Sequence, residues 1–125
     1  MIKFDKEKVL LLQQLVIESS GGGAGVRDFG LLDSAIESAN QTFCGEELYP
    51  TKEEKGARLG FNLVSNHAFV DGNKRIGLLV MLSFLRLNGI VLDYAEKELV
   101  EIGLLIADGK MSYESLLRWV YEHQK

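Results

Sequence analysis

The sequence predicts an all-α domain of about six helices in a compact bundle around one buried helix, with a short flap or hairpin near residues 42–49. Apolar residues recur at helical spacing in successive stretches of the chain, which is typical of amphipathic helices. The stretch from Ile76 to Leu87 is apolar on nearly every side, which indicates a helix in the core. A chain of 125 residues with one proline predicts a single domain, residues 1–125, that buries about two-thirds of its unfolded surface.

Composition and charge exclude several classes of protein. The formal net charge is −4 at pH 7, which does not favour non-specific binding to nucleic acid. The one cysteine, Cys44, excludes an internal disulfide and fits a reducing compartment. The first residues lack the apolar core of a signal peptide, and the longest apolar run, Ile76 to Leu85, is too short to span a bilayer. We therefore expect a soluble, cytoplasmic protein.

The first two predicted helices are separated by a glycine-rich segment. Asp5 is placed to cap a helix from Lys6 to about Glu18. Ser19 to Gly25 ends this helix, and its four glycines within five residues indicate a flexible surface loop. No strand precedes the loop and no Gly-Lys-Ser/Thr follows it, so a phosphate-binding role is not favoured. Asp28 is then placed to cap a second helix, from about Gly30 to Asn40.

Two stretches on either side of the second helix need a separate interpretation. Arg27 is expected to pair with a carboxylate, and the alternative is that it reaches toward an active site. Thr42 to Tyr49 has no helical periodicity, and Gly45 marks a turn within it. We therefore expect a short hairpin or flap there.

The third and fourth helices have clear boundaries. Thr51 with Glu54 is a capping-box pattern that begins a third helix ending near Asn66. The fourth helix is predicted from Asn73 to about Asn88, and Gly89 ends it.

Two further helices complete the prediction. Asp93 with Glu96 resembles the capped start of a fifth helix that continues to about Ala107. Ser112 is placed to cap the last helix. His123, near the chain end, is expected to be a solvated tail residue.

Most of the chain's unusual chemistry lies between the third and fourth helices. These nine residues read His67-Ala-Phe-Val-Asp71-Gly72-Asn73-Lys74-Arg75. The first turn of a helix has free backbone N–H groups and the positive end of the helix dipole, both of which favour an anion. Lys74 and Arg75 add positive charge, and Gly72 permits close approach of the backbone to a ligand. The stretch therefore predicts a phosphate cradle.

Two further residues of this stretch are candidates for chemistry. Asp71 is placed either to cap the fourth helix or to hold Mg²⁺ against phosphates. His67 ends the third helix and is expected to face the same pocket, where an imidazole is suited to accept a proton. From the residues alone, a helix-end histidine followed by ordinary turn residues and a solvated cation pair is the alternative.

The nine-residue motif resembles the signature of the Fic/Doc family, and is most similar to its death-on-curing (Doc) toxin branch. Gly25 to Leu32 and Phe84 to Gly89 are also similar to that branch, so the resemblance covers nearly the whole chain. It implies ATP and Mg²⁺ as cofactors. The residue roles it implies are a general base, His67; a metal ligand, Asp71; and nucleotide contacts from Gly72, Asn73, Lys74 and Arg75.

The branch sets the expected reaction. Fic adenylyl transferases typically have Gly where this chain has Lys74 and a second Arg where it has Leu78, and Lys at the first place is the Doc pattern. The best-known Doc pattern has a polar residue shortly after the motif; this chain lacks it, and Leu79 is the nearest match. Doc toxins are kinases that phosphorylate a threonine of elongation factor Tu and arrest translation, so the resemblance implies a kinase acting on a protein hydroxyl. The alternatives are an adenylyl transferase with the same residues and a catalytically silent binding module.

The resemblance also implies protein partners. Besides an elongation factor Tu-like target, the Doc branch uses a small antitoxin whose disordered tail folds into a groove on the toxin. Self-inhibited Fic enzymes share a Ser/Thr-x-x-x-Glu-Gly/Asn helix; Thr42 to Glu46 is the nearest approach here, but Glu47 follows and Gly45 disfavours a helix. We therefore expect a separate inhibitor, and neither a membrane nor a nucleic acid as partner. In the family a flap near residues 42–49 lies over the active site, so the resemblance implies that position here; the alternative is that these residues form only a structural connector.

Overall fold

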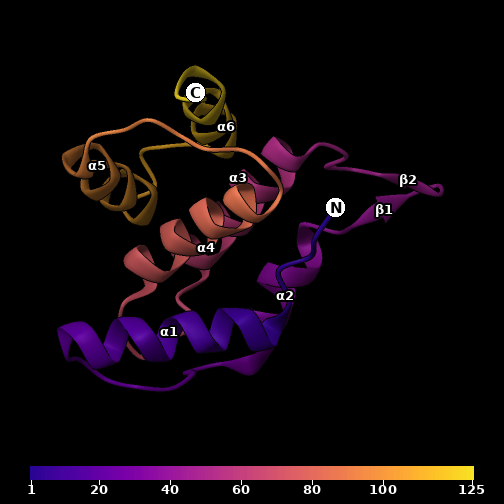
Figure 1. Ribbon diagram of the computed structural model, residues 1–125. Coiled ribbons are helices and arrows are strands. Elements are labelled where there is room, and N and C mark those ends of the chain that lie inside the picture. The colour runs from indigo at the N-terminus through magenta and orange to yellow at the C-terminus, as the bar shows by residue number, and fades with distance from the viewer.

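The computed structural model describes residues 1–125 and contains six helices and one two-stranded hairpin (Figure 1). The helices are α1 (Lys6–Ser20), α2 (Phe29–Ser38), α3 (Lys52–Asn66), α4 (Asn73–Leu87), α5 (Glu96–Ala107) and α6 (Tyr113–Glu122). The antiparallel strands are β1 (Thr42–Phe43) and β2 (Glu46–Glu47). The predicted all-α fold with a hairpin within residues 42–49 is confirmed. No helix combines the length and the hydropathy that crossing a membrane requires.

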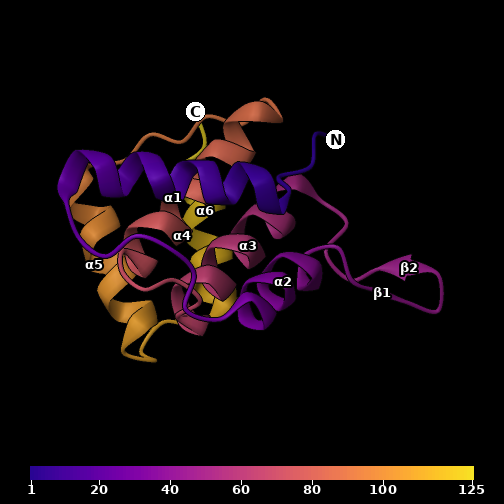
Figure 2. The same ribbon diagram turned by 90° about the horizontal axis from the view of Figure 1, so that it is seen from below.

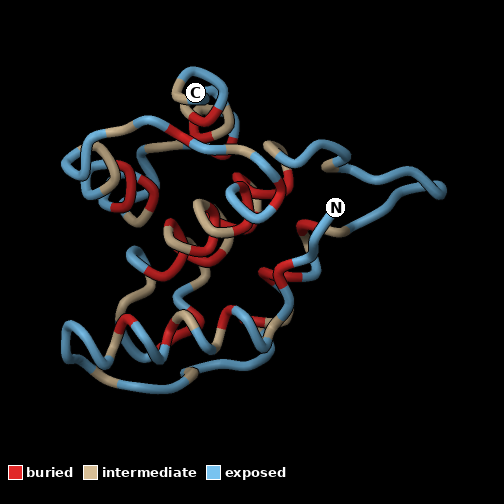
Figure 3. Tube along the Cα trace, in the orientation of Figure 1, coloured by how far each residue is buried: buried red, intermediate tan, exposed pale blue.

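Helices α3 and α4 form the centre of the bundle and pack against each other more extensively than any other pair. Helices α1 and α5 lie against α4, while α2 and α6 lie against α3 (Figure 2). The close approach of α3 and α4 depends on glycine, because a Cβ atom at Gly77 would lie 2.5 Å from the Val64 side chain. Buried residues follow the interior faces of both helices (Figure 3). The motif between α3 and α4 therefore connects the two most constrained elements of the fold.

Four helix N-termini are capped by the residues that the sequence indicates. Asp5 accepts a hydrogen bond from the backbone of Lys8 at 3.0 Å, and Asp28 accepts one from Leu31 at 3.1 Å. Thr51 with Glu54, and Ser112 with the backbone of Ser115, complete the set. Each cap satisfies a backbone donor that the first helical turn leaves free.

The predicted start of α5 is wrong. The helix begins at Glu96, and the carboxylate of Glu98 accepts a hydrogen bond from the backbone N–H of Ala95 at 3.0 Å. Asp93 lies too early to cap the helix, because the N-cap residue is Ala95. The backbone N–H of Asp93 instead donates to the carbonyl of His123 at 2.7 Å. The tail thus folds back onto the segment that leads into α5.

The prediction that His123 is a solvated tail residue is wrong. It is half-buried, its ring stacks on Trp119 with 4.3 Å between centroids, and its Nε2 lies 2.9 Å from a carboxylate oxygen of Glu98. The Ala95 N–H lowers the pKa of the Glu98 carboxyl, and Trp119 and His123 lower it further. The C-terminal residues therefore hold α5 and α6 together.

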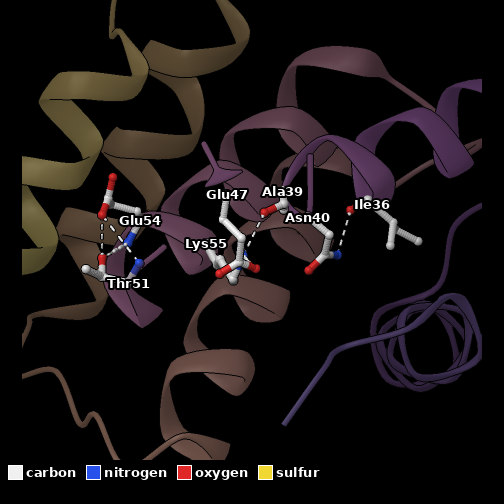
Figure 4. A network of polar contacts seen from close by, with 7 residues as sticks. All are labelled: Ile36, Ala39, Asn40, Glu47, Thr51, Glu54 and Lys55. Carbon is white, nitrogen blue, oxygen red and sulfur yellow. Dashed lines mark hydrogen bonds and ion pairs between the residues drawn. The ribbon is translucent and has the colours of Figure 1, made fainter. Parts of the chain in front are cut away.

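The hairpin is attached to the bundle through a buried lysine at the start of α3 (Figure 4). Only 5% of Lys55 is exposed, and its Nζ atom lies 2.9 Å from the carboxylate of Glu47 and 3.4 Å from the carbonyl oxygen of Ala39. The hairpin projects from this end of α3, whereas His67 follows the other end of the 15-residue helix (Figure 1). A helix of that length spans roughly 22 Å. The expectation that residues 42–49 lie over the active site is therefore wrong.

Candidate active site

His67 lies where α3 ends, as the sequence predicts. It is the C-cap residue of that helix and has left-handed backbone angles, φ 52° and ψ 45°. Such angles are uncommon for a residue other than glycine. The side chain is exposed and its ring makes no hydrogen bond within the protein. The imidazole is therefore open to a ligand.

Arg27 contacts the backbone of His67 from a distant part of the sequence. Its Nε and Nη2 atoms both donate to the His67 carbonyl oxygen, at 2.9 and 2.6 Å. The last carbonyl groups of a helix lack partners within the helix, so this guanidinium satisfies one of them. The prediction that Arg27 pairs with a carboxylate is wrong, and its alternative position beside the candidate site is the observed one.

The segment after α1 lies along the motif. The N–H groups of Arg27 and Asp28 donate to the carbonyl of Ala68 at 2.8 and 3.1 Å, and Val70 N–H donates to the carbonyl of Gly25 at 3.2 Å. These bonds form an isolated antiparallel bridge that centres on Val26. The backbone N–H groups of residues 22–26 donate to no acceptor in the protein.

The glycines of this loop permit direct contact with the motif. A Cβ atom at Gly22 would lie 2.7 Å from Oδ2 of Asp71, and one at Gly23 would lie 2.7 Å from the side chain of Val70. The sequence indicated only a surface loop here, because nothing in a run of glycines reveals what it packs against. The loop over residues 21–26, and not the hairpin, is the segment that lies against the motif.

Asn73 fixes the motif loop internally. Its Oδ1 accepts a hydrogen bond from the backbone N–H of Phe69 at 2.9 Å, and its Nδ2 donates to the Phe69 carbonyl at 3.1 Å. The Phe69 side chain is 1% exposed and lies in the core. The backbone N–H groups of residues 73–75, on the first turn of α4, have no acceptor in the protein. Asn73 thus offers a ligand its backbone N–H while its side chain holds the loop.

Asp71 does not cap α4, so the capping role that the sequence offered for it is wrong. The N-cap residue is Gly72, with φ 78°, and no side chain caps this helix. Oδ1 of the exposed Asp71 accepts a hydrogen bond from the Gly72 N–H at 2.8 Å instead. No group of three His, Cys, Asp or Glu side chains in the chain is arranged to hold a metal ion. A single carboxylate fits Mg²⁺ that arrives largely bound to phosphate oxygens, and does not fit a resident metal.

The structure brings all six predicted site residues into one shallow pocket of about 200 Å³. Its lining residues are His67, Val70, Asp71, Gly72, Asn73, Lys74 and Arg75. Neither cation of the motif forms an ion pair, although Arg75 donates a hydrogen bond to the hydroxyl of Ser20. Two uncompensated cations and three free backbone N–H groups make this end of α4 suited to binding an anion.

An apolar groove of about 390 Å³ begins beside the motif. The sequence alone does not indicate this groove. It lies between α1, α4 and α5, and Lys74 and Arg75 stand at its polar edge. Its apolar lining is Val16, Leu78, Leu79, Leu82, Tyr94, Leu99 and Val100. These residues come from three separate helices and from the connection before α5, which contributes Tyr94, so only the tertiary arrangement reveals the groove.

Comparison with known proteins gives two matches. Residues 3–85 match the Fic/DOC family. The chain is also 41% identical over 88 residues to a protein named Toxin Doc from Mycolicibacterium smegmatis, a match that covers 70% of this chain and 65% of that relative's length. The family match includes the candidate site and the whole of α3.

Proposed function

The chain belongs to the Fic/DOC family, and on this premise we propose that it transfers the γ-phosphate of ATP to a hydroxyl group of a target protein. The observation that carries the proposal is the pocket at the start of α4. There an open imidazole, His67, stands with Lys74, Arg75 and three unpaired backbone N–H groups. The anion site and the base lie on consecutive parts of one short loop, which suits phosphoryl transfer to a hydroxyl.

Each residue has a distinct role in this reaction. The target's hydroxyl oxygen forms a bond to the γ-phosphorus, the bond from that phosphorus to the bridging oxygen of ADP breaks, and His67 takes the hydroxyl proton. The N–H groups of residues 73–75 and the side chains of Lys74 and Arg75 bind phosphate oxygens. Asp71 would hold Mg²⁺, which neutralises phosphate charge when bound. Gly72 lets the backbone approach the nucleotide closely.

Transfer of phosphate, and not of a whole adenylyl group, is supported by Lys74. This residue adds bulk and charge on the first turn of α4, where a smaller residue would leave space for phosphates. The similar protein from Mycolicibacterium smegmatis carries the name Toxin Doc. By resemblance to the Doc branch, the target is a threonine of an elongation factor Tu-like protein, and its modification arrests translation.

Labelled ATP tests the reaction. The chain is incubated with a cytoplasmic extract, and separately with elongation factor Tu, using either γ-labelled or α-labelled ATP. We expect label on protein from γ-labelled ATP only, and none with the His67→Ala variant. Label from α-labelled ATP would show adenylyl transfer instead. The absence of label from both nucleotides would support a catalytically silent binding module.

We further propose that a small antitoxin with a disordered tail restrains this activity by binding the groove between α1, α4 and α5. The groove has an apolar floor that an amphipathic helix can cover. Val100 lines the groove and is 60% exposed, whereas Leu104, on the same helix and 48% exposed, does not line it. These two residues therefore provide a matched pair of variants.

The growth rate of cells that express the chain tests this second proposal. Expression of the chain alone is expected to slow growth, and co-expression of a small protein encoded beside it is expected to restore growth. Val100→Glu is expected to abolish the restoration, because it places a carboxylate in the apolar groove, whereas Leu104→Glu leaves it intact. Unhindered growth with soluble, intact chain would contradict the toxin proposal.

A further inference from the structure

We propose that Arg27 is a positioning residue. Its hydrogen bonds to the carbonyl group of His67 hold the backbone of His67 in the conformation from which the imidazole can reach its reactive position. The proposal rests on the proposed function, in which His67 is the general base. Arg27 itself does not line the pocket of the motif. It therefore acts on the reaction through His67 and not by touching the nucleotide.

In this contact two N–H groups of Arg27 donate hydrogen bonds to a single oxygen atom. Nε and Nη2 of Arg27 lie 2.9 and 2.6 Å from the His67 carbonyl oxygen. A charged donor makes a stronger hydrogen bond than a neutral one. The backbone N–H of Arg27 also donates to the next carbonyl along the chain, that of Ala68, at 2.8 Å. One residue thus fixes two consecutive peptide groups at the point where the chain leaves α3.

His67 needs such an external restraint. Its backbone is in the left-handed region, which costs a residue with a side chain free energy relative to a helical conformation. Its ring is exposed and makes no hydrogen bond that would fix its direction. Because the Cα–Cβ bond follows the backbone, the restraint on the carbonyl group of His67 also fixes the point and the direction from which its side chain leaves the backbone.

The downstream side of the same loop is already fixed. Asn73 holds both backbone polar groups of Phe69, and the Phe69 ring is buried. Without Arg27, the carbonyl group of His67 would have no hydrogen-bond partner in the protein. We therefore expect loss of Arg27 to loosen His67 while Asn73 and the free N–H groups of α4 keep their places.

Arginine suits this role better than the other long side chains. Arg27→Met keeps much of the length and removes both donors, whereas Arg27→Lys keeps a charged donor but cannot offer two fixed N–H groups to one oxygen. Arg118→Met is the matched control, because Arg118 is exposed on α6 and its side chain forms neither a hydrogen bond nor an ion pair within the protein. Thr51→Ala removes a cap at the far end of α3 and controls for general loosening of that helix.

The test measures kcat and the KM for ATP of each full-length variant, together with NMR spectra of the two histidine rings. A misplacement of about 1 Å can reduce a rate about 10²-fold. We expect Arg27→Met to lower kcat about 10- to 100-fold and to leave the KM for ATP within about twofold, with Arg27→Lys recovering part of the loss. The ring signals of His67 should shift or broaden, while those of His123, the only other histidine, stay unchanged.

Several outcomes would overturn the proposal. Unchanged kcat in Arg27→Met would do so, and a raised KM with unchanged kcat would make Arg27 a nucleotide ligand instead. An equal loss of kcat in Thr51→Ala would assign the effect to general destabilisation. If Arg27→Met does not fold, Arg27→Lys decides between the same outcomes. If the wild-type chain transfers nothing, the proposed function fails, yet the NMR spectra still decide whether Arg27 fixes His67.

Discussion

The side chain of Asn73 makes two hydrogen bonds to the backbone of Phe69, one to its N–H at 2.9 Å and one to its carbonyl at 3.1 Å. Only a side chain with both a donor and an acceptor makes this pair, which explains an amide at the first position of α4. The contact fixes the loop that bears His67 and Asp71, and it leaves the Asn73 backbone N–H free for an anion.

Replacement of Asn73 by aspartate should separate these two effects. Asn73→Asp keeps the acceptor for Phe69 N–H, removes the donor to the Phe69 carbonyl, and adds negative charge beside the proposed phosphate site. We expect the free energy of unfolding to fall by about 1–2 kcal/mol, measured by urea denaturation. Because the added negative charge repels phosphate, we expect ATP affinity to fall at least about tenfold, which corresponds to about 1.4 kcal/mol. Calorimetric titration measures this affinity. ATP affinity equal to that of the wild type would remove the anion site from this turn.

Tyr113 should make stability sensitive to alkaline pH. Burial raises the pKa of Tyr113 to about 12, and the charge of Glu54 adds to the effect. In the unfolded chain a tyrosine has a pKa of about 10. The raised pKa means that the folded state favours the neutral phenol, so this stabilisation is complete below about pH 10 and is lost as the pH rises toward about 12.

Tyr113→Phe should remove this alkaline dependence. At neutral pH the variant should lose about 1 kcal/mol, because the hydroxyl of Tyr113 donates a hydrogen bond to the Glu54 carbonyl at 3.2 Å. Urea denaturation of both proteins at neutral pH and between about pH 10 and 12 measures the difference. Parallel decreases in stability for the two proteins would contradict this assignment.

The elements of the fold were predictable because their signals are local. Helical periodicity and the capping residues Asp5, Asp28 and Thr51 each act within a few residues along the chain. The motif was found for the same reason, since His67 to Arg75 are contiguous and a tight loop between two helices must bring them together.

What was missed depends on contacts between distant segments. Arg27 lies 40 residues from the His67 carbonyl that it binds, and His123 lies 25 residues from Glu98. The glycines of residues 21–25 indicate a loop whichever surface they pack on. The position of the hairpin followed from the direction of α3, which places residues 42–49 at the opposite end from the motif. Local patterns carry no information on any of these pairings.

His67→Ala should abolish transfer and leave the fold intact. The imidazole is exposed and makes no hydrogen bond in the protein, so its removal should change the free energy of unfolding by at most about 0.5 kcal/mol. Loss of a positioned general base should lower kcat about 10²- to 10⁴-fold. Transfer of labelled phosphate at saturating ATP measures the rate, and urea denaturation measures the stability. A wild-type rate in this variant would remove His67 from the mechanism.

Gly22→Ala should displace the carboxylate of Asp71, and comparison with Gly25→Ala isolates that effect. Both glycines have positive φ, 110° and 102°, so alanine is similarly strained at either position. A methyl group at residue 22 would lie 2.7 Å from Oδ2 of Asp71, whereas one at residue 25 meets no atom within 4 Å. We therefore expect similar losses of stability, of about 1 kcal/mol each. Only Gly22→Ala should in addition require more Mg²⁺ for half-maximal transfer, since Asp71 is the proposed metal ligand. Equal Mg²⁺ requirements in the two variants would show that the loop does not position this carboxylate.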